Sequence, residues 1–344
     1  MLFRSAVSSF RLTYNNSQIH RTWSKYFDAQ EMGVRNIANM MPGFMRVTVG
    51  GGFTLGPASA SASDTPTKTF QMAEDFSWIH GNHQIGFGGN YIHSSLDAKS
   101  YINAAGAFTF TNQNTGLGLA DFLIGRPSQL QQGMVYYLRQ KNNYIGTYVQ
   151  DAWKVHPRLT LNLGLRYDMQ NHVGPELNLS PFLPGDRGTF HNWAPRVGFA
   201  YTVTDRTVVR GGYGKFFAQG TADEAHQTIL YMIGISPVLN YDGRADWASN
   251  PWNGPTPSYT QIVNNACDVN GNRTGCFSRQ FIPEIANPFW RTPYSHQSSI
   301  GIEHQIGSAM ALQTNVVYTG GRLEEGSRNI NLTYKDRKST RLNS

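Results

Sequence analysis

Apolar and polar residues alternate strictly along residues 159–168, and this alternation is the clearest structural signal in the chain. Side chains of a β-strand point to opposite faces with a period of two, so one face is apolar and the other is polar. The apolar face holds Leu159, Leu161, Leu163, Leu165 and Tyr167, and the polar face holds Thr160, Asn162, Gly164, Arg166 and Asp168. A strand of this length, tilted by ~40–45°, covers a height of ~21–23 Å, close to the ~25 Å apolar band of an outer-membrane barrel. We therefore predict a transmembrane β-hairpin over residues 144–171, with its turn at His156-Pro157.

The same alternation recurs along the chain and predicts an all-β fold, an antiparallel transmembrane β-barrel. A first strand is expected over residues 2–15. The further hairpins are 67–80 with 83–96 around Gly81-Asn82, 192–204 with 206–218 around Thr204-Asp205, and 296–307 with 309–319 around Gly307-Ser308. Two-residue turns alternate with long connections at 16–66, 172–191 and 219–295. Short periplasmic turns and long extracellular loops are typical of outer-membrane barrels and uncommon in compact soluble domains. About nine membrane-crossing strands result, too few to close a large barrel.

Residues 97–155 are constrained by strand parity. If Gly81-Asn82 and the central turn lie at the same membrane face, an even number of crossings separates them. Three candidate strands lie between these turns, at 105–112, 128–140 and 142–155. We expect the last two to join into one long strand that projects beyond the membrane. Segment 105–112 then belongs to a loop, beside a short helix at 118–125.

Composition fits a barrel and excludes other classes. Hydrophobic residues make up 40% of the chain, and no apolar run reaches the ~18 residues of a transmembrane helix. The 35 glycines, 17 tyrosines and 19 phenylalanines suit strands with aromatic girdles at the membrane interfaces. The net charge of +7 is scattered, with no basic helix or finger motif, so we expect no nucleic-acid binding.

Several segments together resemble the barrel of TonB-dependent outer-membrane receptors, in particular the Oar-like group. The matching stretches are YVQDAWKVHPRLTLNLGLRYD around the central hairpin, FQMAEDFSWIHGNHQIGFGGNY (70–91), GLADFLIGRPS (118–128), WAPRVGFAYTVTDRTVVRGGYGKFF (193–217) and YTGGR (318–322). The resemblance covers roughly residues 67–322 and implies a 22-stranded barrel, plugged by an N-terminal domain, in the bacterial outer membrane. It also implies import of a scarce solute with energy delivered through TonB, in a setting of outer-membrane lipid and lipopolysaccharide.

On this resemblance, residues 1–336 are expected to be a partial barrel, without the plug, the TonB box and the C-terminal strands. Residues 337–344 (RKSTRLNS) are expected to be a non-native tail. Two alternatives stay open. One is a passive porin or surface adhesion barrel without TonB coupling, and the other is a soluble, secreted β-sandwich lectin.

The sequence contains no motif of a known catalytic constellation. GxSxG, HExxH, Walker A and strand-linked GxGxxG patterns are absent, so we expect neither an enzyme nor a cofactor. Cys267 and Cys276 are predicted to form a local disulfide in an oxidising compartment. Their segment offers too few ligands for zinc. It also lacks the glycine and glutamate of a calcium loop, where Arg273 and Arg279 stand instead. No metal site is expected.

Two groups of residues are candidates for contact with a solute or a plug. The first comprises the lumen-facing charges Arg166, Asp168, Arg196, Arg210 and Glu303. The alternative for them is that they pair with one another and do not contact a solute. The second comprises aromatic residues of the long connection 219–295, for which a small core of the loop itself is the alternative: Trp247, Trp252, Tyr259, Phe277 and Trp290. Binding residues concentrate on loops that a rigid scaffold holds. Near the central turn, Trp153 is expected to anchor at the interface and Asp151 to stabilise the turn.

Overall fold

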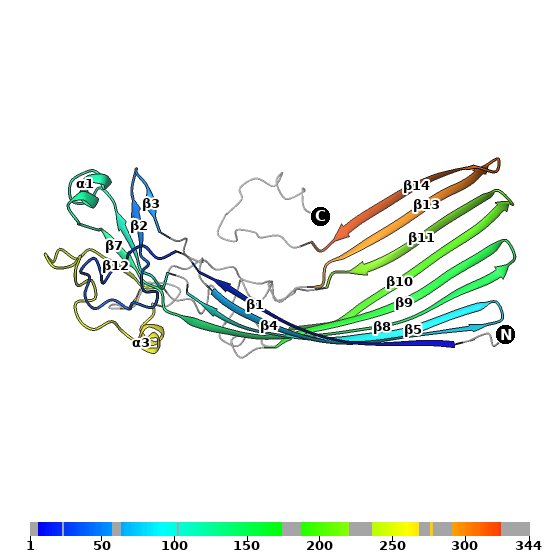
Figure 1. Cartoon of the computed structure of the whole chain (residues 1–344), viewed down its shortest axis with the longest axis horizontal. Helices are drawn as coiled ribbons and strands as arrows, with labels where there is room; N and C mark the ends of the chain where they lie inside the picture. The colour runs from blue at the N-terminus through cyan, green and yellow to red at the C-terminus, as the bar shows by residue number, and fades with distance from the viewer. Residues whose placement is uncertain are drawn as a thin grey trace, which may run out of the picture.

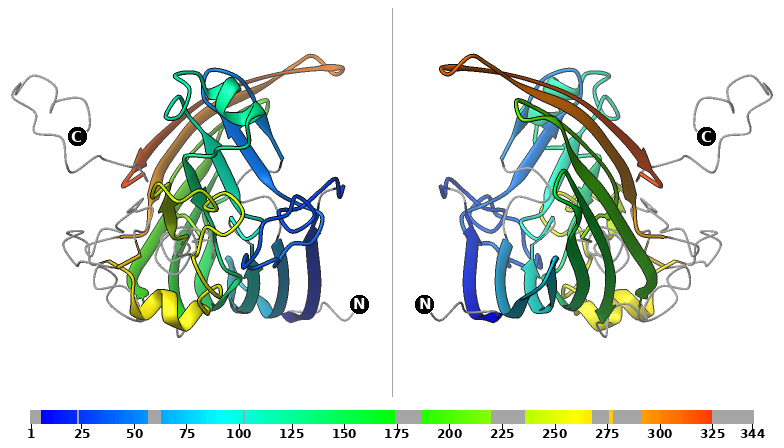
Figure 2. Two further views of the ribbon diagram at one scale, coloured as in Figure 1. Left: turned by 90° about the vertical axis from the view of Figure 1, so that its left-hand side faces the viewer. Right: turned by 90° about the vertical axis from the view of Figure 1, so that its right-hand side faces the viewer.

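Nine long strands form one antiparallel sheet that curves along its width (Figures 1 and 2). The computed structural model describes residues 6–22, 24–56, 63–101, 103–173, 187–219, 236–267, 276–277 and 291–324. The strands of this sheet are β1 (Ala6–Arg21), β4 (Ser63–His80), β5 (His83–Ser100), β8 (Tyr136–His156), β9 (Leu159–Val173), β10 (Arg187–Thr204), β11 (Thr207–Phe217), β13 (Tyr294–Ile306) and β14 (Met310–Arg322). They are neighbours in chain order, and every pair is antiparallel. The predicted number of crossing strands and the fold class are confirmed.

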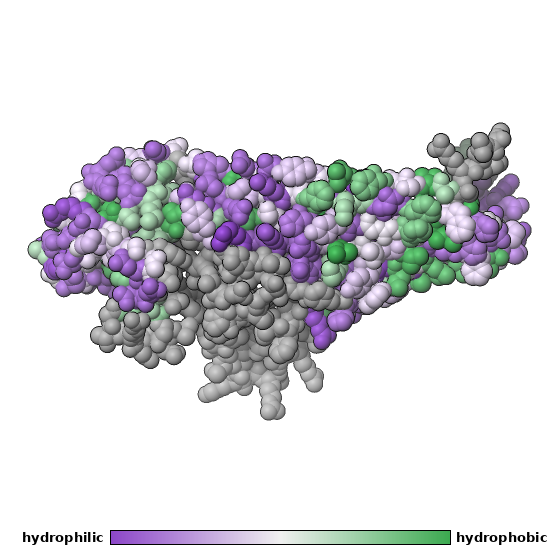
Figure 3. Space-filling model, turned by 90° about the horizontal axis from the view of Figure 1, so that it is seen from below, coloured by the Kyte–Doolittle hydropathy of each residue, from purple (hydrophilic) through white to green (hydrophobic). Residues whose placement is uncertain are grey.

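The register keeps the predicted faces separate across the whole sheet. Phe87, Val149 and Leu165 lie opposite one another on three adjacent strands, and the next row places Tyr148 opposite Arg166. The outward residues have no protein cover, since Val149 is 52% and Leu165 is 41% exposed. Figure 3 shows green hydrophobic residues gathered towards the hairpin-turn end and purple hydrophilic residues beyond them. This apolar belt is left uncovered by the rest of the described chain.

The turns and strand ends differ slightly from the predictions. The turn at Gly81-Asn82 lies where it was expected, but the central turn is Pro157-Arg158, because His156 pairs with Leu159 to close it. The third turn is likewise shifted by one residue, since Thr204 pairs with Thr207. β1 also runs on to Arg21, so the first connection spans 22–62 and not 16–66.

A second sheet lies beyond the far end of the strands, on the left in Figure 1. Its order is β12-β7-β6-β2-β3. Its strands are β2 (Arg46–Val49), β3 (Thr54–Leu55), β6 (Ala107–Phe110), β7 (Gln129–Gln131) and β12 (Val238–Asn240). The same connections also contain the two short helices α1 (Gly118–Leu123) and α3 (Tyr259–Asn264). We call residues 24–56, 103–135 and 236–267 the loop subdomain.

The expectation that 128–140 and 142–155 join into one long strand is confirmed for Tyr136–His156 but wrong for the residues before Tyr136. Gln129–Gln131 pair with β6 and β12 in the second sheet, and the crossing strand β8 begins only at Tyr136. The physical reason is burial, because Leu130 is 0% exposed in the core of the loop subdomain. The other half of that expectation is confirmed, since Ala107–Phe110 lie outside the large sheet and α1 follows them.

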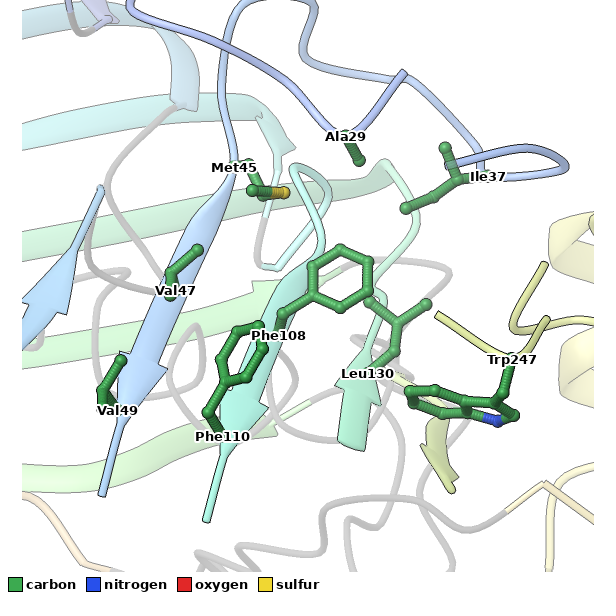
Figure 4. Close-up of a cluster of buried hydrophobic side chains, with 9 residues drawn as sticks. All are labelled: Ala29, Ile37, Met45, Val47, Val49, Phe108, Phe110, Leu130 and Trp247. Atoms are coloured by element: carbon green, nitrogen blue, oxygen red, sulfur yellow. The ribbon is translucent and has the colours of Figure 1, made fainter. Parts of the chain in front are cut away.

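The loop subdomain has a hydrophobic core of its own, shown in Figure 4. It joins residues from all three connections: Ala29, Ile37, Met45, Val47, Val49, Phe108, Phe110, Leu130 and Trp247. Hydrogen bonds also link the connections. The Arg35 N–H donates to the Ser249 carbonyl at 2.6 Å, and Gln132 Nε2 donates to the Ala38 carbonyl at 2.7 Å. Three loops therefore fold as one body, although each belongs to a different hairpin connection. Among the described residues, no helix has the length and apolarity needed to cross a membrane.

Candidate functional site

The polar face of β5, β8 and β9 carries a connected group of side chains, which we call the wall network: Asn90, Tyr144, Arg166 and Asp168. Arg166 Nε donates to Asp168 Oδ1 at 2.9 Å, and its Nη2 donates to the Tyr144 hydroxyl at 2.9 Å and to Asn90 Oδ1 at 3.1 Å. The Tyr144 hydroxyl in turn donates to Asp168. Asp168 is buried, at 7% exposure, and a buried charge needs partners. The Arg166 guanidinium and the Tyr144 hydroxyl compensate it. The network holds the guanidinium rigidly against the wall.

A second polar group lies beside the wall network on the same face. The Tyr148 hydroxyl donates to Asp75 Oδ1 at 2.6 Å, and Arg11 forms an ion pair with the same carboxylate. Tyr148 stands directly opposite Arg166 in the register. Four strands, β1, β4, β8 and β9, therefore bring two arginines, two aspartates and two tyrosines together on one wall.

Two glycines make room for these side chains. A Cβ on Gly146 would overlap the Arg166 guanidinium and lie 2.7 Å from Asn90 Oδ1. A Cβ on Gly88 would lie 2.9 Å from both Asp75 Oδ1 and a ring carbon of Tyr148. Gly146 and Gly88 are thus positions where the wall admits large side chains from neighbouring strands.

A hollow of about 510 Å³ lies along the same wall. Polar residues from six strands line it, among them Ser9, Asp75, Gln84, Gln150, Asn162 and Arg196. Arg196 holds its guanidinium over the Phe216 ring, 4.5 Å from the ring centroid. The lining offers hydrogen-bond donors and acceptors side by side, which suits contact with a polar solute or a polar protein surface.

The five predicted charges separate into three places. Arg166 and Asp168 meet in the wall network, Arg196 lines the hollow, and Arg210 pairs with Glu303 across 3.3 Å. The last pair is open to solvent, with side chains 62% and 42% exposed. Within the described ranges, no group of three or more His, Cys, Asp or Glu side chains could hold a metal ion.

The predicted aromatic contacts of the long connection have different surroundings. Trp247 is 1% exposed and packs in the core of the loop subdomain. It therefore belongs to the loop's own core, which was the alternative, and the expectation that it contacts a solute at the surface is wrong. Trp252 is half-buried, donates to Gln132 Oε1 at 3.1 Å and meets the Phe277 ring edge-on at 5.6 Å. Tyr259 begins α3, and Trp290 lies outside the described residues.

Covalent and polar anchors fix the loop subdomain. Cys267 and Cys276 form a disulfide with their Cα atoms 4.8 Å apart. The fully buried Asp121 accepts hydrogen bonds from the Thr115 N–H at 2.8 Å, the Asn114 N–H at 3.0 Å and the Thr115 hydroxyl at 2.6 Å. Burial acts to raise the pKa of Asp121, but these hydrogen bonds outweigh it and hold the pKa below its usual range. α1 is thereby tied to the turn before it.

The outer surface near the hairpin turns carries a contact between a histidine and a carboxylate. His83 Nδ1 lies 2.6 Å from Asp151 Oδ2, and the His83 ring stacks on Trp153 at 5.3 Å. Asp151 therefore contacts the neighbouring hairpin rather than its own turn. Trp78 stacks on His80 in the same region, at 5.2 Å.

Sequence reasoning missed half of the polar wall. Asn90, Tyr144 and Tyr148 were not singled out, and neither were Arg11 and Asp75. Period-two parity places both tyrosines on one face of β8, but only the register between strands shows that this is the face of Arg166.

Comparisons with known proteins agree with this architecture. A family model described as an outer membrane beta barrel domain matches residues 2–343. The TonB-dependent transporter Oar of Myxococcus xanthus is 41% identical over 54 residues, which are 16% of this chain and 4% of that protein.

Two solved structures are similar to this chain over most of its length. The outer membrane transporter YddB of Escherichia coli is 12% identical, with a TM-score of 0.50 over 92% of this chain and 32% of that one. The ferripyoverdine receptor of Pseudomonas aeruginosa is 15% identical, with a TM-score of 0.44 over 91% of this chain and 30% of that one. The chain thus spans about a third of the length of these structures. From the matched model and the observed sheet, the chain belongs to the outer membrane beta barrel domain family and resides in the bacterial outer membrane.

Proposed function

We propose that this chain is part of the barrel of a TonB-dependent receptor, which binds a scarce solute at the cell surface and imports it with energy from the inner membrane. The observation that carries the proposal is the combination of a polar, hydrogen-bonded inner wall with three loops folded into one body beyond it. A passive channel needs only a wall. A receptor also needs a pre-formed surface that meets the solute outside.

The described residues suggest how the work is divided. The loop subdomain is held by its own core and a disulfide, so it presents a fixed surface with Trp252 half-buried beside Phe277. The hollow that Arg196 lines lies on the polar wall of the large sheet. We propose Arg196 and Trp252 as solute contacts, and we propose the wall network as the part of the barrel that keeps its shape during transport.

The test is solute uptake by cells that carry the full-length protein, with and without a functional TonB. The expected result is growth on a limiting solute, or uptake of its radiolabelled form, that stops when TonB is deleted or the proton-motive force is collapsed. Purified protein in planar bilayers is expected to show no steady open conductance.

The competing function is a passive porin or adhesion barrel, and the same pair of measurements identifies it. Uptake that persists without TonB, together with an ohmic conductance, would overturn the receptor proposal. Arg196→Ala is expected to weaken solute binding, and Arg210→Ala is the matched control, because Arg210 is an exposed arginine on a neighbouring strand outside the hollow.

A further inference from the structure

One carboxylate interrupts the apolar outer face of β4. Every second side chain of this strand faces outward, and between the membrane-spanning aromatic residues this outward row is Phe70, Met72, Glu74, Phe76 and Trp78. The register places Glu74 on the same face as its opposite neighbour Phe10 of β1, which is 64% exposed. Glu74 is therefore a charged residue in an otherwise apolar row.

The position of Glu74 along β4 lies well inside the apolar belt. Glu74 stands six residues from His80, where the strand ends, and at ~3.3 Å per residue and a ~40–45° tilt this is a height of about 14–15 Å. Trp78, an aromatic anchor of the membrane interface, lies at a height of only about 5 Å. In a band ~25 Å tall, Glu74 is thus near the middle.

The surroundings leave this carboxylate without a counter-charge. The Ser8 hydroxyl donates to Glu74 Oε1, and it is the one partner that Glu74 has among the described residues. Arg11 does not reach this face, because it pairs with Asp75 on the polar face. Ionisable residues within a membrane are costly and are rare outside functional sites. The carboxylate therefore marks a place where a cation fits.

We propose that Glu74 and Ser8 form a binding site for a lipophilic amine, a molecule that carries one ammonium group between two hydrocarbon arms. The carboxylate supplies the complementary charge. Gly89 lies directly opposite Glu74, so no side chain covers the carboxylate from β5. Beside this opening lie Phe76 and Phe87, with their ring centroids 4.9 Å apart, and aromatic rings attract cations.

The depth of the site explains the two arms of the ligand. Apolar side chains lie on both sides of Glu74 along β4, with Met72 at 42% and Trp78 at 40% exposure. Hydrocarbon is therefore covered in both directions from the ammonium group. The amines of bulk phospholipids stay with the headgroups outside the hydrocarbon core, so they do not reach this depth. The site faces lipid and not the lumen, so it does not depend on the import function.

The experiment measures binding of radiolabelled dioctylamine to the full-length protein in nanodiscs of phosphatidylcholine, which has no protonatable amine. From the contribution of a hydrogen bond to a charged group, Glu74→Gln is expected to weaken binding at least about 10-fold. Glu74→Asp keeps the charge and is expected to retain most of the binding. Dioctyl ether, which has the arms without the charge, is expected not to displace the amine.

A relocated carboxylate is the matched control. Glu74→Gln with Val149→Glu puts the charge on the same face, at an exposed position between the bulky Phe87 and Leu165. This double variant is expected not to recover binding. Binding equal to that of the wild type would show that any carboxylate in the belt suffices and would overturn the proposal, as would unchanged binding by Glu74→Gln alone.

Chemical labelling gives a second readout at the residue itself. Dicyclohexylcarbodiimide, which partitions into lipid, is expected to modify Glu74 and to spare Asp205, whose side chain is 97% exposed at a turn. Mass spectrometry of the peptides measures this, and dioctylamine is expected to shield Glu74. Shielding without the amine would overturn the proposal. If it appears with phosphatidylethanolamine, bulk lipid occupies the site, and if it grows with the number of protein copies per nanodisc, a second copy does.

Discussion

The large sheet and the loop subdomain place apolar side chains in opposite surroundings. In the sheet, Leu163 is 44% and Val316 is 64% exposed, whereas in the loop subdomain Leu130 and Ile262 are 0% exposed. The first region depends on lipid to cover its apolar surface, and the second covers its own, as a water-soluble domain does. One part of the chain therefore folds against lipid and the other against water. Among the described residues, the clusters of buried hydrophobic side chains lie in the connections and not in the long strands.

The largest expected effect comes from the core of the loop subdomain. Trp247→Ala removes a fully buried indole, and we expect the subdomain to lose about 3–5 kcal/mol of stability. Hydrogen exchange over residues 24–56 and 103–135 measures this loss, while β8 and β9 stay protected. Leu123→Ala is the control, because Leu123 is 75% exposed and its truncation is expected to change stability by no more than about 0.5 kcal/mol. Equal effects of the two variants would contradict the separate core.

The next effect tests the membrane face of the sheet. Leu163→Arg places a charge on the exposed apolar face of β9, near mid-belt, and we expect it to cost about 2–4 kcal/mol in lipid bilayers. Asn162→Arg changes the adjacent residue on the polar face and is expected to cost much less. Unfolding of the full-length protein from liposomes in urea measures both. A larger cost at position 162 would invert the assignment of faces.

A smaller effect distinguishes the buried ion pair of the wall from an exposed one. Asp168→Asn leaves Arg166 without its carboxylate, and we expect a loss of about 1–3 kcal/mol. Glu303→Gln breaks the exposed pair with Arg210 and is expected to cost no more than about 1 kcal/mol. The same unfolding assay ranks the two variants, and the reverse order would show that the wall network does not stabilise the barrel.

The smallest expected effect is the pH dependence of the loop subdomain. Backbone N–H groups of Gly43 and Glu31 donate to Asp28 and lower its pKa, and the pKa of Asp121 is also below its usual range. A carboxyl with a depressed folded-state pKa stabilises the fold fully above its unfolded value of about 3.9 and loses this contribution as the pH falls through the folded value. The protection of amides over 103–135 against hydrogen exchange, relative to their intrinsic rate at each pH, is therefore expected to fall between about pH 4 and pH 2. Asp121→Asn is expected to flatten that response, and an unchanged profile would contradict the role of this carboxylate.

The loops show where sequence reasoning reached its limit. Gln129–Gln131 look like the start of a crossing strand, because alternation is the same for any strand, whichever sheet it joins. Only the parallel pairing of Val47 with Phe108, and the antiparallel pairing of Leu130 with Phe108 on the other side, shows that a second sheet exists. Val47 belongs to another connection than Phe108 and Leu130, and Phe108 and Leu130 stand 22 residues apart, so no local pattern links the three.

The sequence by itself determined the crossing strands, their tight turns and the two faces of each strand. These properties follow from the period-two alternation of side chains, which is local to each strand. The tertiary structure decided which residues meet. It brought Asn90 of β5 to Arg166 of β9, and it put Trp247 into a core and not onto a surface. Register and loop packing depend on residues far apart in the chain, and their free energies come from burial and hydrogen bonds that exist only once the strands are paired.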